Sequence, residues 1–219
     1  MKVLNLYAGL GGNRKHWKGC HVTSVEIDPN IAYVYKEIHC VNGNIKNLPH
    51  DTVIIDDAHQ YLLDHYQEFD FIWSSPPCQS HSSMDLANGK NKPRYPEMAL
   101  YQEIIFLKHY FKGKWVVENV NPYYDPLIPA LRLGRHLFWA NFHIGSHDVP
   151  RPENFINLTN VAGSNKLKDW LGIHYEGNLY YDGNHNPAQV LANCVHPDLG
   201  LHIYQCANHG DLFNQIGDM

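Results

Sequence analysis

The chain has 219 residues, of which 44% are hydrophobic and 18% charged, the composition of an ordinary globular protein of one domain with at most a small appendage. Its formal net charge of −5 counts weakly against a nucleic-acid-binding protein, because phosphate contacts need Lys or Arg, although the 16 histidines are a further source of positive charge. No apolar run reaches the length of a membrane span, and the N-terminus has no secretory layout. Five scattered cysteines without a CxxC pair predict reduced thiols in a cytosol.

The first predicted element is a strand at residues 3–7, followed by a glycine-rich turn at residues 8–12 and a helix that begins at Asn13. Glycines let the backbone approach a ligand closely, and the N-terminus of a helix offers N–H groups that lack intrahelical partners. The turn is neither GxGxxG nor a Walker loop. It therefore predicts either a nucleotide-binding turn or only a tight connection between a strand and a helix.

The second predicted strand, residues 21–26, ends in Glu26, and a helix follows at about 31–39. An acid that closes the second strand is placed to accept hydrogen bonds from the two hydroxyls of a ribose. Asp28 and Asn30 suit the N-cap of the helix, because Pro29 fits a first helical turn. Together with the glycine turn, Glu26 predicts an adenosine-type cofactor.

Further strands are predicted at 40–45 and 69–73, and the segment 52–63 is expected to pass into a helix. Two prolines end the strand at 69–73 and leave Cys78 beyond its carboxyl end, where open α/β sheets place their chemistry. A cysteine there is either a small buried hydrophobic residue or a nucleophile. The polar segment 80–93 follows directly and is either a loop that closes over a site or an ordinary surface loop.

A helix at 97–111 leads to a strand at 114–120, which carries Glu118 near its end. If the strands before Cys78 and around Glu118 are parallel neighbours, both side chains lie at one edge of the sheet. A further strand is expected at 134–144, and residues 145–187 are polar with a helix only at 166–171. Residues 190–197 lead into a last helix at about 198–209.

Charged and histidine-rich groups leave two more hypotheses. Three clusters of basic residues predict either a local basic face or solvated surface: Arg14-Lys15-Lys18, Lys90-Lys92-Arg94 and Arg132-Arg135. Four histidines are candidate metal ligands, but no HxxxH or CxxC spacing supports a metal site: His143, His147, His174 and His185.

Five motifs, in this order along the chain, resemble those of the DNA cytosine-5 methyltransferases: Leu6-Tyr7-Ala8-Gly9-Leu10-Gly11-Gly12, Val25-Glu26-Ile27-Asp28, Ser75-Pro76-Pro77-Cys78-Gln79, Val117-Glu118-Asn119-Val120 and Ala192-Asn193-Cys194-Val195. The resemblance implies a doubly wound, mostly parallel α/β sheet of the class I methyltransferase type, similar to a Rossmann fold. It implies S-adenosyl-L-methionine as cofactor and a cytosine in double-stranded DNA as substrate.

The resemblance also implies roles for residues. Cys78 would attack carbon 6 of the base, Glu118 would hold the N3 and amino group, and Arg135 would contact the base carbonyl. The cofactor would be bound by Tyr7, Ala8, Gly9, Leu10, Gly11, Glu26, Ile27, Asn44, Pro77, Asn193 and Val195. Residues 1–144 and 188–219 would form the catalytic domain, and residues 145–187 a target-recognition region. So short a region implies a short target site, or help from a partner subunit or a second copy in a homodimer.

Two alternatives stay open at this point. An RNA (tRNA) cytosine-5 methyltransferase of the same fold would use cysteine and glutamate identically, and a non-catalytic regulatory subunit would bind DNA or the cofactor without turnover. Restriction–modification, phage defence and gene regulation would all employ the same catalytic domain, in the cytoplasm of a bacterial or phage-infected cell.

Overall fold

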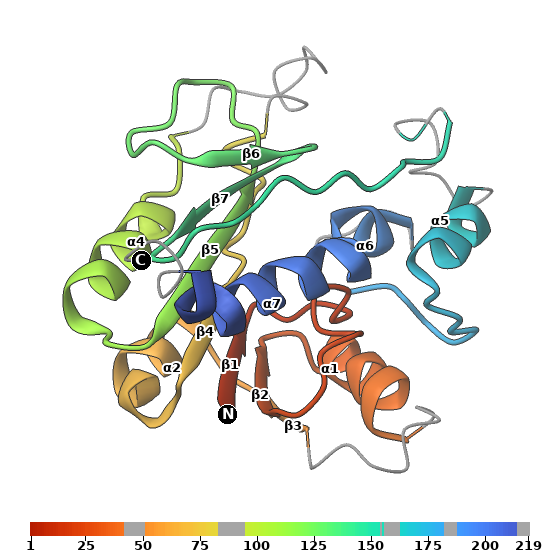
Figure 1. The fold of residues 1–219 in the computed structure, drawn as a ribbon. Coiled ribbons are helices and arrows are strands. Elements are labelled where there is room, and N and C mark those ends of the chain that lie inside the picture. The colour runs from red at the N-terminus through yellow and green to blue at the C-terminus, as the bar shows by residue number, and fades with distance from the viewer. Residues whose placement is uncertain (42–50, 83–94, 154, 156–162, 182–187, 214–219) are drawn as a thin grey trace.

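The computed structural model describes residues 1–41, 51–82, 95–153, 155, 163–181 and 188–213 (Figure 1). Its centre is a sheet with the strand order β3-β2-β1-β4-β5-β7-β6. The strands are β1 (Lys2–Leu6), β2 (His21–Glu26), β3 (Thr52–Ile55), β4 (Phe71–Ser74), β5 (Lys114–Val120), β6 (Leu131–Leu133) and β7 (His136–Ala140).

The sheet is doubly wound, as the sequence predicts. β1 pairs in parallel with both β2 and β4, and β4 pairs in parallel with β5. β7 runs antiparallel to β5, and β6 runs antiparallel to β7. The strand order reverses between β1 and β4, and in open α/β sheets ligands bind beyond the carboxyl ends of the strands at such a point. The topology therefore places the candidate site at the ends of β1 and β4.

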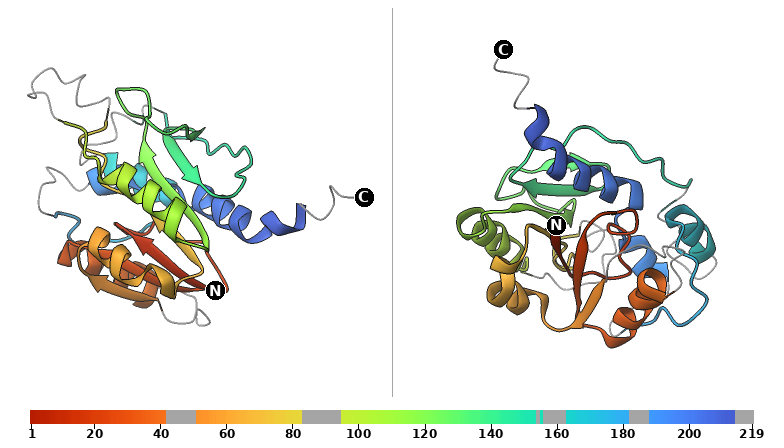
Figure 2. Two further views of the ribbon diagram at one scale, coloured as in Figure 1. Left: turned by 90° about the vertical axis from the view of Figure 1, so that its left-hand side faces the viewer. Right: turned by 60° about the horizontal axis from the view of Figure 1, so that its bottom comes forward.

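Helices surround the sheet (Figures 1 and 2). They are α1 (Pro29–Lys36), which continues into a π-helical turn (Glu37–Val41), α2 (Ala58–His65), a 3-10 turn (Tyr66–Glu68), α4 (Ala99–Tyr110), α5 (Ser164–Leu171), α6 (Ala188–Asn193) and α7 (Pro197–Phe213). Asp28 caps α1 by accepting hydrogen bonds from the backbone N–H groups of Asn30 and Ile31, with Pro29 in the first turn, as predicted.

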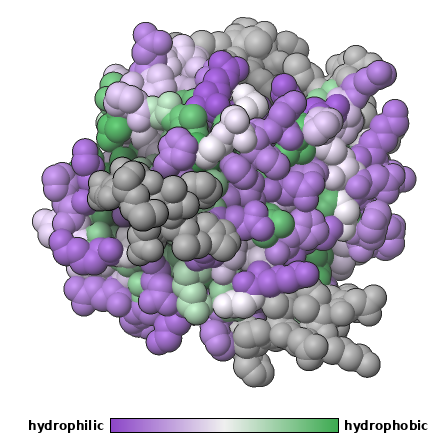
Figure 3. All heavy atoms as spheres, in the orientation of Figure 1, coloured by the Kyte–Doolittle hydropathy of each residue, from purple (hydrophilic) through white to green (hydrophobic). Residues whose placement is uncertain are grey.

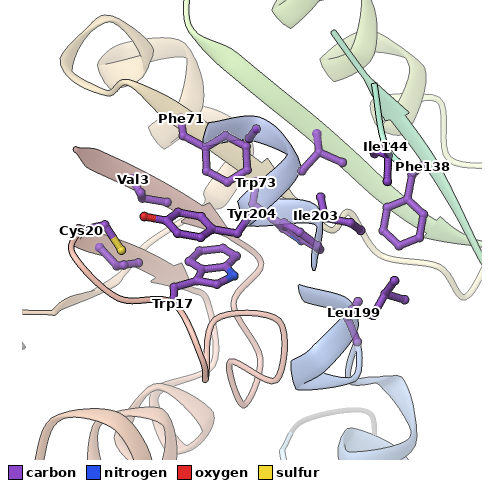
Figure 4. Packing of buried hydrophobic residues seen from close by; sticks show 14 of the residues in the cluster. Val3, Trp17, Cys20, Phe71, Trp73, Phe138, Ile144, Leu199, Ile203 and Tyr204 are labelled. Carbon is purple, nitrogen blue, oxygen red and sulfur yellow. The ribbon is translucent and has the colours of Figure 1, made fainter. Parts of the chain in front are cut away.

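Alternating strand residues give the sheet two apolar faces. Leu4, Ile72 and Val117 pack with α2 and α4 on one face, whereas Val3 and Trp73 pack with α7 on the other. The cluster around Val3 and Trp73 is rich in aromatic rings (Figure 4). The ring of Trp17 stacks on Tyr204 with a centroid distance of 5.1 Å, which fixes α7 against the N-terminal half of the sheet.

The prediction of a helix that begins at Asn13 is wrong, because residues 12–16 form turns. Trp17 is drawn into the core instead, where its indole N–H donates to the carbonyl of Gly200 at 3.0 Å. Gly200 lies so close to the backbone of Asn13 that a Cβ atom there would come within 2.0 Å of the Asn13 carbonyl oxygen. Contact with α7 therefore fixes this turn in place of a helix.

Three other predicted elements also need correction. Cys40 and residue 41 belong to the π-helical turn after α1, so no strand begins there, and 42–50 lie outside the described residues. The third strand is β3, at the start of the segment expected to pass into a helix. The strand expected at 134–144 is β7, which is shorter than predicted, and a turn through Gly134 at φ +60° joins it to the additional strand β6.

Residues 163–179 pack onto the body of the protein. Leu167, Leu171 and Leu179 share a buried apolar cluster with Leu10 and Ile31, which belong to the glycine turn and α1. In addition, the ammonium of Lys15 donates to the carbonyls of Leu171 and Gly172 at the end of α5. The division of the chain into a catalytic domain and a recognition region remains a proposal.

The face in Figure 3 is mostly hydrophilic, with small hydrophobic patches. Of the helices that the structure describes, none combines the length and apolar character needed to cross a membrane. Within the same ranges, no group of three or more His, Cys, Asp or Glu side chains is arranged to hold a metal ion.

Candidate active site

A cavity of about 340 Å³ lies at the carboxyl edge of the sheet, where β1 and β4 diverge. Its volume is in the range of small-molecule sites. Most of the residues implied by the motifs line it together: Tyr7, Ala8, Gly9, Leu10, Glu26, Ile27, Pro77, Cys78, Glu118, Asn193 and Val195. Tertiary structure thus gathers separate segments of the chain around one space.

Cys78 and Glu118 come together because β4 and β5 are parallel neighbours. Ser74 pairs with Val117 at the end of β4, so the Pro-Pro-Cys turn and Glu118 leave the sheet side by side. The side-chain amide of Asn119 donates to the carbonyl of Pro76 at 2.9 Å and is buried, which ties this turn to β5. Cys78 and Glu118 lie at one edge of the sheet, as predicted, and they line the same cavity.

Glu118 is bound by a histidine that the sequence analysis did not single out. His136 Nδ1 lies 2.5 Å from Glu118 Oε1, and both side chains are buried. Burial alone would raise the pKa of Glu118, but His136, a hydrogen bond from Ser75 and the charge of Arg135 outweigh it and lower the pKa. Burial lowers the pKa of His136 despite the adjacent carboxylate. The lowered pKa favours the ionised form of Glu118, which accepts a hydrogen bond from His136 Nδ1.

Arg135 does not line the cavity. Its guanidinium donates to the carbonyl of Ala192 and, at 3.0 Å, to that of Cys194, so it closes the C-terminal end of α6. Burial lowers the pKa of Arg135, whereas Glu118, Cys194 and Cys78 act in the opposite direction. The Arg135 cation thus lies within electrostatic reach of Cys78. The contact between Arg135 and a base carbonyl remains a prediction.

The turn after β1 and the end of β2 form the other half of the cavity. The backbone N–H of Gly9 donates to one carboxylate oxygen of Glu26 at 2.9 Å, and the N–H of Asp28 donates to the other at 3.0 Å. Each oxygen keeps a further lone pair for a ligand hydroxyl. Gly9 adopts φ +53°, and a Cβ atom there would meet no atom within 4 Å, so the backbone lies open to the cavity.

The next two glycines serve packing. A Cβ atom on Gly11 would lie 2.5 Å from the ring of His39, and one on Gly12 would lie 2.5 Å from the carbonyl oxygen of Val195. Gly11 does not line the cavity, so its implied contact with the cofactor is not supported. Asn44, the remaining implied contact, lies outside the described residues.

Sequence reasoning missed three residues of this site. His136 follows Arg135 directly, and only the register of β7 against β5, with Glu118 opposite Phe138, shows that His136 is diagonal to the glutamate on the same face. Tyr181 comes from the expected recognition region and lines the cavity with Cys78 and Glu26. Glu103 on α4 accepts a hydrogen bond from the Tyr7 hydroxyl, and nothing in the sequence of this largely apolar helix predicts the contact.

The basic cluster at Arg14 differs from the predicted basic face. Arg14 is buried and forms a bidentate ion pair with Asp51, with contacts of 2.5 and 2.6 Å. Lys15 binds backbone carbonyls at the end of α5. The cluster at Arg14 is therefore structural, whereas the cluster at Lys90-Lys92-Arg94 lies outside the described residues together with most of the polar segment 80–93.

The fold and cavity define a class I methyltransferase, with an acid at the end of the second strand and an open turn after the first. The chain belongs to the C-5 cytosine-specific DNA methylase family, whose model matches residues 1–125. It is a methyltransferase that uses S-adenosylmethionine, as the motifs imply.

Several solved structures are similar to the chain at low identity. A methyltransferase of Entamoeba histolytica is 11% identical to this chain. The match covers 97% of this chain and 98% of the Entamoeba chain, with a TM-score of 0.49. A hypothetical protein of Thermus thermophilus is 22% identical over 64% of this chain and 73% of its own, with a TM-score of 0.42. A SAM-dependent methyltransferase of Agrobacterium tumefaciens is 16% identical over 57% of this chain and 40% of its own, with a TM-score of 0.40. The assignment rests on the family match and not on these distant structures.

The residues present fit S-adenosylmethionine. Glu26 offers carboxylate oxygens for ribose hydroxyls, and the open backbone at Gly9 leaves room for a ligand that a side chain would fill. Asn193 and Val195, which the motifs imply for the methionine end, line the same cavity. When bound there, the cofactor supplies an electrophilic methyl group.

Proposed function

We propose that the protein methylates carbon 5 of a cytosine in double-stranded DNA through a covalent adduct at Cys78. The observation that carries the proposal is that Cys78 and Glu118 line one cavity with the turn and carboxylate expected to hold the methyl donor. A nucleophile and a buried carboxylate beside a donor site suit a base that must be activated before it can react.

The chemistry assigns each residue a task. Carbon 5 of cytosine is a poor nucleophile, so the Cys78 thiolate first adds to carbon 6 and turns the ring into an enamine. Glu118 holds the N3 and the amino group of the base. It takes up a proton for this step and donates it toward N3, so that the negative charge that develops there during the attack is neutralised. After carbon 5 is methylated, a base removes its proton, the electrons re-form the ring double bond, and the bond from carbon 6 to Cys78 breaks. Water is a candidate for that base.

The substrate base must leave the double helix to reach this cavity. A flipped base loses its stacking and pairing at a cost of a few kcal/mol. We infer that residues 145–187 take part in recognising the target, and Tyr181 supports this because it connects that region with the cavity. A second copy of the chain or a partner subunit would extend so short a recognition surface.

The covalent step has a direct test. Duplex DNA with 5-fluorocytosine at the target traps the adduct, because carbon 5 then carries fluorine in place of the proton that a base must remove before Cys78 can leave. With S-adenosylmethionine present, we expect a protein–DNA species that survives denaturation, and we expect Cys78→Ala to abolish it. Cys206→Ser on α7 is a matched control, since that thiol lies outside the cavity and should leave the adduct intact. An adduct that persists in Cys78→Ala would contradict the mechanism.

The two alternative functions give different results. Transfer of labelled methyl groups to tRNA alone, and never to duplex DNA, would favour an RNA methyltransferase, because Cys78 and Glu118 would act identically on either polymer. Binding of the cofactor and DNA without any transfer would favour a regulatory subunit. Presence of both Cys78 and Glu118 in the cavity favours an enzyme over a regulatory subunit.

A further inference from the structure

A fully buried carboxylate lies beneath the cavity and takes no part in the chemistry above. Glu103, on the inner side of α4, has no solvent exposure. Its Oε1 accepts a hydrogen bond from the Tyr7 hydroxyl at 2.5 Å and contacts His59 Nδ1 at 3.0 Å, while its Oε2 accepts one from the Ser74 hydroxyl at 2.5 Å. A charge this deep is stable only when such partners surround it.

The three donors come from three segments that build the cavity. Ser74 ends β4 and directly precedes the turn that carries Cys78. His59 lies in the first turn of α2, next to Ala58, which lines the cavity. Tyr7 directly follows β1 and itself lines the cavity. Glu103 thus connects both halves of the site from below.

Tyr7 has an unusual backbone conformation that needs support. Among the residues whose placement is described, it is the one non-glycine residue with a positive φ, at 54°. This left-handed conformation is unfavourable for a residue with a Cβ atom and persists only where surrounding contacts impose it. The hydrogen bond to Glu103 is such a contact, and it lies just before the open turn at Gly9.

We propose that Glu103 is a positioning residue for the methyl donor: it holds Tyr7 in its left-handed conformation and thereby gives the turn at Ala8–Leu10 the shape that binds S-adenosylmethionine. This inference rests on the assignment of the cavity to the donor, which the proposed function shares. Charges around the network are consistent with it. Burial and Glu103 raise the pKa of Tyr7, so its hydroxyl keeps the proton that it donates. Glu103, with smaller contributions from Asp57 and Glu97, raises the pKa of His59.

Binding of S-adenosylhomocysteine, measured by titration calorimetry without DNA, tests the proposal independently of catalysis. We expect Tyr7→Phe and Glu103→Met each to weaken binding about tenfold, the scale of one hydrogen bond to a buried charge. Because both changes break the same bond, the double variant should also lose only about tenfold. Glu103→Gln keeps an oxygen for Tyr7 and should restore affinity to within about threefold of the native value.

A change of stability alone must be separated from a change of donor binding. Ile104→Val, at the neighbouring buried position of α4, should lower thermal stability without altering the dissociation constant. In turnover, Tyr7→Phe should raise the KM for the donor more than it lowers kcat. Tyr7→Phe keeps the core intact, so it gives a result even if Glu103→Met does not fold.

Several outcomes would overturn the inference. The first is a native affinity for S-adenosylhomocysteine in Tyr7→Phe. The second is a loss of affinity of about a hundredfold in the double variant, which would mean that the two changes act independently. The third is an affinity of Glu103→Gln that is as low as that of Glu103→Met. Failure of the native protein to bind S-adenosylhomocysteine would overturn the inference and the donor assignment together. Binding without methylation of DNA would overturn only the proposed function.

Discussion

Glu118 and His136 show how a single contact sets the chemistry of the site. Both side chains are buried, and one carboxylate oxygen of Glu118 is occupied by His136 Nδ1 at 2.5 Å. Ser75 donates a further hydrogen bond to Glu118, and in the proposed mechanism the carboxyl group also holds the substrate base. Because a carboxyl group at this depth must be oriented by hydrogen bonds, His136 helps to fix how Glu118 faces the cavity.

At the scale of the residue, we expect His136→Ala to lower the rate of methyl transfer by about tenfold to a hundredfold, since it leaves the Glu118 carboxylate without its main donor. His136→Asn keeps an N–H near the position of Nδ1 and should retain more of the rate than His136→Gln, whose amide lies near that of Nε2. Single-turnover rates at saturating donor provide the measurement. Equal rates in the Asn and Gln variants would show that the Nδ1 contact does not matter.

At the scale of the element, the parallel pair β4 and β5 positions Cys78, the proposed nucleophile, and Glu118. Their shared edge brings Cys78 near Glu118, but the turn between β4 and Cys78 has little regular hydrogen bonding of its own. The buried bond from Asn119 to the Pro76 carbonyl supplies the missing connection. Asn119 therefore acts on Cys78 through the backbone of the turn.

We expect Asn119→Ala to lower kcat by about tenfold, because the Cys78 turn loses its fixed position, while affinity for S-adenosylhomocysteine stays close to native. Asn141→Ala is a matched control at the opposite end of β5. Asn141 also bridges backbone groups, through Trp115 N–H and the Gly113 carbonyl, yet it lies far from the cavity along the strand. A similar loss of kcat in both variants would point to general weakening of β5 instead.

At the scale of the whole molecule, histidines make the fold sensitive to acid. Among the described residues, burial lowers the pKa of six histidines: His16, His39, His81, His136, His147 and His196. For His39 the pKa falls from 6.5 to about 3. Between these values the unfolded chain binds protons that the folded protein does not, so the free energy of unfolding rises with pH. Glu118, with its lowered pKa, acts in the same direction, whereas His59 and Glu26 act against it.

We therefore expect the urea midpoint at pH 5 to be clearly lower than at pH 7.5. His39 accounts for part of the difference, because its ring lies 2.8 Å from the carbonyl oxygen of Leu10 and stays neutral when folded. His39→Gln keeps an N–H for that carbonyl and cannot gain a proton, so the variant should show a smaller change between the two pH values. A midpoint that does not change with pH in the native protein would contradict this account.

Much of the fold was readable from local patterns. The strand at 114–120 was predicted with the observed bounds, and the N-cap at Asp28 follows from Pro29 beside a short acid. The helix expected at Asn13 failed because Trp17 and Gly200 pack against each other over a distance of 183 residues. The strand expected at Cys40 failed because α1 continues into a π-helical turn.

The sequence by itself determined much of the order of the elements, the family and the two residues, Cys78 and Glu118, on which the proposed chemistry depends, because motifs and periodicity are local properties of the chain. Only the tertiary structure decided their partners. His136 binds Glu118, Glu103 binds Tyr7, and Gly11 and Gly12 serve packing more than ligand contact. Such pairings depend on strand register and helix docking, which bring together residues from distant parts of the chain.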